Sequence, residues 1–108
     1  MAVLEHLEPG RVFHFFEQMS AIPRGSGNTK AVSDWLAEFA RERGLRYQQD
    51  ALNNIIIFKD ASAGYEGAEP VILQGHMDMV CEKEADSGHD FDRDPIRILR
   101  DGGRLYAD

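Results

Sequence analysis

Cysteine, long apolar runs and basic charge are all scarce in this sequence of 108 residues. Its single cysteine, Cys81, excludes an internal disulfide and fits a reducing compartment. No apolar stretch approaches the roughly 20 residues that span a bilayer. The N-terminus lacks the basic start and apolar core of a secretion signal, so we expect a cytoplasmic protein.

Basic residues are outnumbered, with 12 Lys and Arg against 19 Asp and Glu and a net charge of −7. This balance argues against nucleic acid and against anionic membrane surfaces as partners. Seven acidic residues gather where only Lys83 and Arg93 oppose them: Asp78, Glu82, Glu84, Asp86, Asp90, Asp92 and Asp94. We interpret this run as a solvated loop, with a cation-attracting rim beside a functional site as the alternative.

Apolar spacing predicts two amphipathic helices in the first half of the chain. The first helix lies between Pro9 and Ile22, and Pro23 ends it. Its apolar stripe is Val12, Phe15, Phe16 and Met19. The second helix is expected to stop at Gly44 in left-handed geometry. Its stripe is Val32, Trp35, Leu36, Phe39 and Ala40. In the loop between the helices, Ser26 or Asn28 is placed to cap the second helix.

Turn residues and β-branched runs predict strands in the second half. Residues 45–49 and 54–58 are expected to pair around a turn near Asn53. Residues 61–68 are small and contain glycine, which predicts a loop. A hairpin is expected from residues 96–106, with its turn at Asp101-Gly102-Gly103.

The run Val71-Ile72-Leu73-Gln74 is expected to be a buried central strand that ends at Gly75, directly before His76. The fold class is therefore α/β: two helices, then a mainly β segment whose central strand ends at His76. Sheet order does not follow from the order of elements alone.

His76 and Asp78 follow that strand two residues apart. Ligand sites in open α/β sheets lie outside the carboxyl ends of strands. An imidazole at such a position can bind a metal, and a nearby carboxylate can hold the other ring N–H. Taken alone, these few residues favour an exposed turn histidine over a functional site.

The surrounding residues give the pair a context. The stretch from Gly75 to Lys83, GHMDMVCEK, resembles the metal-binding segment of the aminoacyl-histidine dipeptidases. That family is part of the two-zinc exopeptidase clan, which also holds aminoacylases and glutamate carboxypeptidases. The resemblance covers essentially the whole chain. Its further segments are Ile22–Asn28, Asn53–Ile55, His89–Phe91, Asp94–Ile96 and Leu105–Asp108.

The resemblance implies that residues 1–108 are the N-terminal portion of a metallopeptidase catalytic domain, without the rest of that domain or a lid domain. The parent enzyme would bind two Zn²⁺ ions and hydrolyse small dipeptides, some of the aminoacyl-histidine type. His76 would be a metal ligand. Asp78 would be a catalytic-site residue that holds the His76 ring or tunes the general base.

By the same resemblance, the bridging Asp, the general-base Glu and the remaining ligands would lie beyond Asp108. The fragment alone is therefore expected to be inactive and not to bind both ions. Two alternatives stay open. The chain is a short natural relative that serves as a non-catalytic binding or interaction module, or it is a single-metal hydrolase, for which one histidine makes a weak site.

The other candidate residues are interpreted structurally. His6, His14 and His89 are not needed as ligands. Cys81 is expected to be small and half-buried, because a catalytic thiol needs a base and an orienting group. We also expect self-association of the chain through an exposed sheet edge or apolar face.

Overall fold

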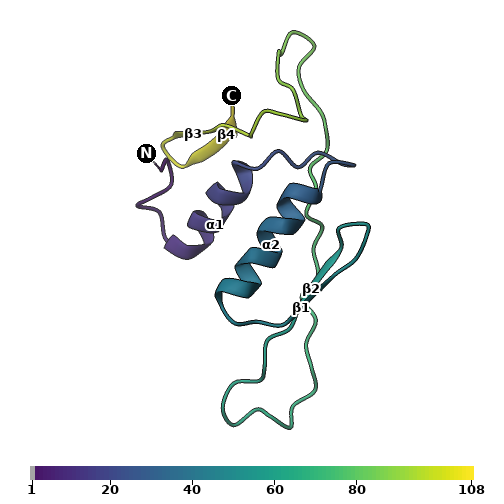
Figure 1. Ribbon diagram of the computed structural model, residues 1–108. Coiled ribbons are helices and arrows are strands. Elements are labelled where there is room, and N and C mark those ends of the chain that lie inside the picture. The colour runs from purple at the N-terminus through teal and green to yellow at the C-terminus, as the bar shows by residue number, and fades with distance from the viewer. Residues whose placement is uncertain (1) are drawn as a thin grey trace.

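The computed structural model describes residues 2–108 and contains two helices and two β-hairpins (Figure 1). The elements are α1 (Gly10–Ser20), α2 (Lys30–Glu42), β1 (Tyr47–Gln49), β2 (Ile55–Ile57), β3 (Ile98–Asp101) and β4 (Arg104–Ala107). β1 pairs antiparallel with β2, and β3 with β4, as two separate sheets. The expected α/β class is confirmed. Neither helix is long and apolar enough to cross a membrane in the part of the chain that is described.

Gly44 terminates α2, as the sequence predicted. Gly44 has a φ of +66°, a left-handed conformation that costs little without a Cβ. Its N–H donates to the Arg41 carbonyl at 3.1 Å, and the Leu45 N–H donates to the Ala40 carbonyl at 2.9 Å. These two bonds form a Schellman motif, which satisfies carbonyls that the helix leaves free.

The start of α2 differs from the prediction. Thr29 occupies the N-cap position, and no side chain makes a capping hydrogen bond there. The expectation that Ser26 or Asn28 caps this helix is therefore wrong. The Ser26 hydroxyl is engaged by a distant carboxylate instead, and the Asn28 amide reaches the Asp92 carbonyl at 3.5 Å.

The core lies on both sides of α2. The helix buries Val32, Ala37 and Ala40 almost completely. Toward α1, the Phe15 ring packs edge-on against Phe39, with 5.4 Å between ring centroids. On its other side α2 contacts the β1–β2 hairpin. The turn of that hairpin places Asn53 at a φ of +69°, near the position expected from the sequence.

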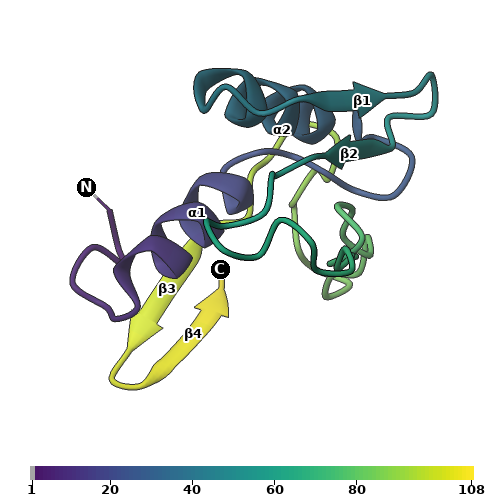
Figure 2. The same ribbon diagram turned by 90° about the horizontal axis from the view of Figure 1, so that it is seen from below.

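The apolar stripe predicted for α1 is only partly buried. Val12 is 61% exposed and Phe16 is 45% exposed. Phe16 faces a groove of about 190 Å³ between α1 and the β3–β4 hairpin, whose other lining includes Ile98 and Tyr106. The β3–β4 hairpin lies beside α1 in both views (Figures 1 and 2).

The central strand expected at residues 71–74 does not form. This segment is a long trace without regular structure (Figure 1). Val71, Ile72 and Leu73 are 83%, 88% and 94% exposed. A strand requires a neighbour that exchanges ladder hydrogen bonds, and no described segment pairs with these residues. The prediction of a buried strand is therefore wrong for this chain, although the β-branched composition still favours strand geometry.

The shape of the chain explains why that segment stays uncovered. The chain exposes 8711 Å², whereas a folded monomer of 12.2 kDa exposes about 6,100 Å². Its radius of gyration is 16.5 Å, against about 13 Å for a compact domain of this length. Loops on either side of residues 71–74 extend away from the helices (Figures 1 and 2). The chain thus buries less of itself than a self-contained domain of this mass.

We expect Val32→Ala to lower the free energy of unfolding by about 2 kcal/mol, because it removes fully buried methyl groups from the contact face of α2. Val12→Ala on α1 is the matched control, and its loss should stay under about 0.5 kcal/mol. Urea unfolding followed by circular dichroism measures both. Equal losses in the two variants would contradict the assignment of the core.

Candidate functional site

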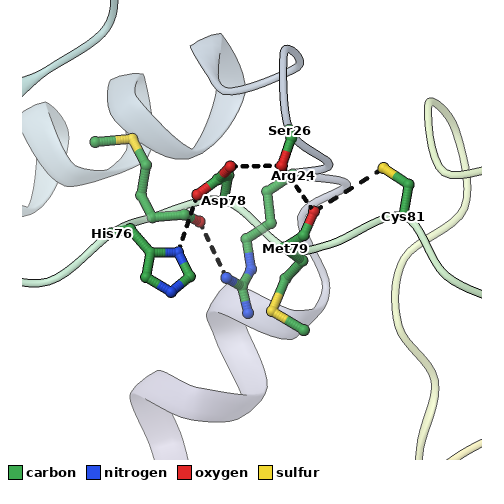
Figure 3. A network of polar contacts seen from close by, with 7 residues as sticks. Arg24, Ser26, His76, Asp78, Met79 and Cys81 are labelled. Atoms are coloured by element: carbon green, nitrogen blue, oxygen red, sulfur yellow. Dashed lines mark hydrogen bonds and ion pairs between the residues drawn. The ribbon is translucent and has the colours of Figure 1, made fainter.

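The candidate site forms where the loop after α1 meets residues 76–81 (Figure 3). The two segments join through an isolated parallel bridge between Gly25 and Met79. The Met79 N–H donates to the Arg24 carbonyl at 2.8 Å, and the Ser26 N–H donates to the Met79 carbonyl at 3.1 Å. Backbone bonds therefore fix the position of one segment on the other.

Gly25 permits this close approach. A Cβ at position 25 would lie 2.6 Å from the Cys81 sulfur, inside the limit that non-bonded atoms tolerate. The same glycine begins a tight turn, since the Asn28 N–H donates to the Gly25 carbonyl at 2.8 Å. Gly27, the third residue of the turn, has a φ of +85°, as a type II turn requires. This turn presents the Ser26 side chain toward residues 76–79.

His76 and Asp78 lie on the same side of their segment. The His76 Nδ1 is 2.9 Å from Asp78 Oδ1, and the Ser26 hydroxyl donates to Asp78 Oδ2 at 2.6 Å (Figure 3). The His76 side chain is 78% exposed and that of Asp78 is 34% exposed. Ser26, Asp78 and His76 thus form one continuous chain of polar contacts that ends at an accessible imidazole.

These contacts lower the pKa of the Asp78 carboxyl below its ordinary value. The hydrogen bond from Ser26 is the largest cause and the bond to His76 is the second, because both stabilise the charged form. Asp78 is therefore an anion at neutral pH, and it accepts hydrogen bonds at both of its oxygens.

Arg24 ties the end of α1 to the same segment. Its Nη1 donates to the Met77 carbonyl at 3.0 Å, and its Nε donates to the Met19 carbonyl at 3.2 Å. Partial burial lowers the pKa of Arg24, and the charge of Asp78 opposes that shift. Arg24 remains a cation, and it braces the backbone beside His76.

The arrangement suits one metal ligand. With Nδ1 engaged by Asp78, the exposed His76 ring has Nε2 free to bind a metal ion. No group of three or more His, Cys, Asp or Glu residues that could hold a metal occurs within residues 2–108. His76 therefore fits a metal site as a single contributor, and further ligands would have to come from outside this group of residues.

Cys81 borders this arrangement, whereas His14 and His89 make their contacts with aromatic rings elsewhere. Cys81 is exposed, not half-buried as expected, and its sulfur is 3.9 Å from the Met79 carbonyl. His89 packs its ring edge-on against Phe91 at 4.7 Å, and its Nε2 is buried without a hydrogen-bond partner. His14 lies on α1, 5.2 Å from the Phe15 ring. The structural interpretation of His14 and His89 agrees with these contacts.

Sequence reasoning missed two residues of the site. The sequence pattern offered Ser26 as a possible cap of the second helix, and it gave Arg24 no role beyond the matched segment Ile22–Asn28. Both reach across 52 or 53 residues of sequence to their partners. The Gly-Ser-Gly-Asn turn was visible in the sequence, but nothing local indicated which segment it would face.

Comparison with known proteins agrees with the predicted resemblance. No protein-family model matches the sequence. The chain is 37% identical over 107 residues to the cytosol non-specific dipeptidase of Escherichia coli (strain K12), which covers 99% of this chain and 22% of the relative. The crystal structure of aminoacylhistidine dipeptidase from Vibrio alginolyticus matches with a TM-score of 0.91 and 34% identity, over 97% of this chain and 21% of that chain. The chain therefore spans about a fifth of the length of the relatives it matches.

We expect Asp78→Asn to weaken the dependence of the free energy of unfolding on pH at acidic pH. Because the folded pKa of Asp78 is lowered, its charge stabilises the fold above about pH 4, and this contribution is lost as the pH falls through the folded value. The variant lacks that carboxylate, so it should lose less stability than the parent chain between about pH 4 and pH 2. Thermal unfolding across that range measures the difference. Asp86→Asn, on the acidic loop, is the control, and an effect as large there would contradict the prediction.

Proposed function

We propose that this chain is the N-terminal portion of the catalytic domain of a metal-dependent dipeptidase of the aminoacyl-histidine type. One observation carries the proposal: the backbone matches a solved aminoacylhistidine dipeptidase with a TM-score of 0.91 at 34% identity. The His76–Asp78 pair lies within the motif that suggested the family. A non-catalytic interaction module is not favoured, because the relatives that match are dipeptidases.

In this proposal His76 binds a zinc ion through Nε2. Asp78 holds the ring by its Nδ1–H, fixes the tautomer and makes the ring a better ligand. Zinc, when bound, lowers the pKa of a coordinated water and polarises the scissile carbonyl. The resemblance implies two such ions in the whole enzyme, a bridging Asp and a general-base Glu. This chain contributes one imidazole and the carboxylate that orients it.

The isolated chain is proposed to be inactive. A lone imidazole provides little affinity for a divalent ion, and residues 2–108 contain no group of three or more His, Cys, Asp or Glu residues that could hold one. The substrate of the whole enzyme would be a small dipeptide. A cytoplasmic location is supported by the name of the Escherichia coli relative, a cytosol dipeptidase.

A chimera tests this function with the chain itself. Residues 2–108 would replace the matching fifth of the Escherichia coli dipeptidase. We expect the chimera to fold, to bind zinc and to hydrolyse an aminoacyl-histidine dipeptide. His76→Ala in the chimera should abolish turnover and reduce the bound metal. Asp78→Ala should lower metal affinity or turnover by about 10- to 100-fold, as is typical of residues that orient a ligand.

His14→Ala is the matched control, since His14 lies on α1 away from the pair. It should leave turnover and metal content unchanged. A folded chimera that hydrolyses the dipeptide equally well with and without His76 would overturn the proposal. So would metal content that does not depend on His76.

We further propose that residues 71–73 form a docking edge. In a solution of the isolated chain, a second copy of the chain covers this edge. The chain exposes about 2,600 Å² more than a compact monomer of its mass, well above the roughly 800 Å² per partner of a standard interface. The three side chains carry no charge that would oppose pairing with another strand. In the whole enzyme the remaining polypeptide would cover them.

Ile72→Lys should shift the isolated chain from dimer or larger species toward monomer, because it places a charge on the exposed edge. Sedimentation velocity at increasing concentration measures this. Leu52→Lys, at a position that is 80% exposed on the β1–β2 turn, should leave association unchanged. A parent chain that stays monomeric at high concentration would contradict the docking edge without affecting the proposed activity.

A further inference from the structure

We infer that Ser26 is a positioning residue for His76 and acts through the Asp78 carboxylate. It would hold the carboxylate so that Asp78 Oδ1 keeps the His76 ring in the Nδ1–H form. The orientation of the ring is argued from this chain alone. Only its use in metal binding rests on the proposed function.

The two oxygens of Asp78 are divided between two partners. Ser26 donates to Oδ2 at 2.6 Å, and His76 Nδ1 lies 2.9 Å from Oδ1. The terminal torsion of an aspartate is broad, so a single contact does not fix the plane of the carboxylate. A second contact at the other oxygen does fix it. Ser26 thereby determines the direction in which Oδ1 faces.

Ser26 can act in this way because its own position is fixed by the segment that it restrains. Its N–H donates to the Met79 carbonyl at 3.1 Å, and Met79 in turn donates to Arg24 at 2.8 Å. The turn closed by Asn28 and Gly25 sets the direction of the Ser26 side chain. The hydroxyl and its acceptor therefore belong to one hydrogen-bonded unit, unlike two surface side chains that meet by chance.

The His76 ring has little other restraint. Its side chain is 78% exposed, so packing does not hold it. The contact with Asp78 decides which ring nitrogen carries the proton, because a carboxylate can only accept. With the proton on Nδ1, Nε2 keeps its lone pair toward solvent (Figure 3). This is the form that a metal ion requires.

The tautomer of His76 tests the inference without any metal. Imidazole ¹⁵N chemical shifts of the whole 108-residue chain would be measured at a pH where free histidine is neutral. We expect the Nδ1–H form to predominate in the parent chain. Ser26→Ala should shift the ring toward a mixture of both tautomers, and Ser26→Thr, which retains the hydroxyl, should restore the parent ratio. Ser62→Ala, on the exposed loop before residues 71–74, is the control and should change nothing.

The Met79 amide distinguishes a positioning role of Ser26 from a purely structural role. Its hydrogen exchange reports the backbone bridge, and it should stay slow in Ser26→Ala. If Ser26→Ala loosens the loop, Ser26→Cys shows whether the lost hydrogen bond or the looser loop changes the tautomer, because a thiol is close in size to a hydroxyl but donates weakly. Ser26→Cys should then shift the tautomer ratio as Ser26→Ala is expected to do. An unchanged ratio in a variant whose bridge is intact would overturn the inference.

Metal affinity in the chimera separates this inference from the proposed function. Competition with a chelator should show zinc bound about 10-fold more weakly in Ser26→Ala and normally in Ser26→Thr. A chimera that binds no zinc would contradict the proposed function, while the tautomer ratio would still decide the role of Ser26. Zinc bound as tightly in Ser26→Ala as in the parent chimera would overturn the role of Ser26 in metal binding, whereas the tautomer ratio decides its role in positioning the ring.

Discussion

The backbone pairing of Gly25 with Met79 is the contact on which the site depends. It joins the loop after α1 to a segment that the Arg24 side chain also braces at the Met77 carbonyl. Residues 71–74, just before this segment, have no strand partner. The backbone pairing places the Ser26 hydroxyl against the Asp78 carboxylate. A side chain at position 25 would meet the Cys81 sulfur at 2.6 Å. Glycine at this position therefore lets the two segments lie this close without displacing the Cys81 side chain, directly beside Ser26.

Features set by short stretches of sequence could be predicted. The α2 stop depends on Gly44 and the carbonyls of the last helical turn, and the β1–β2 hairpin depends on a turn next to a β-branched run. The proximity of His76 and Asp78 follows from their spacing, because alternate residues of an extended segment share a side. In each case the interacting groups lie within a few residues of one another, so propensity and spacing contain most of the information.

Features set by distant contacts could not be predicted. The role of Ser26 depends on a partner 52 residues away, and its capping propensity suggested a different role. The burial expected for Val71–Leu73 failed for a related reason. Composition indicates that a segment favours strand geometry, but burial requires a neighbour. A neighbouring strand is supplied by the rest of the fold, which a local pattern does not describe.

The residues that orient His76 are therefore distinct from the residues that would give a metal site its affinity. The chain corresponds to about a fifth of the matching dipeptidases, yet it already holds its histidine in a fixed relation to a carboxylate and a hydroxyl. A ligand that is oriented before the metal arrives loses less freedom on binding, so the free energy of coordination is reduced less by ordering. Affinity still requires several ligands that converge on one ion. In the proposed function, a segment of this size thus sets the tautomer and direction of one ligand, while the strength of the site comes from the residues that converge with it.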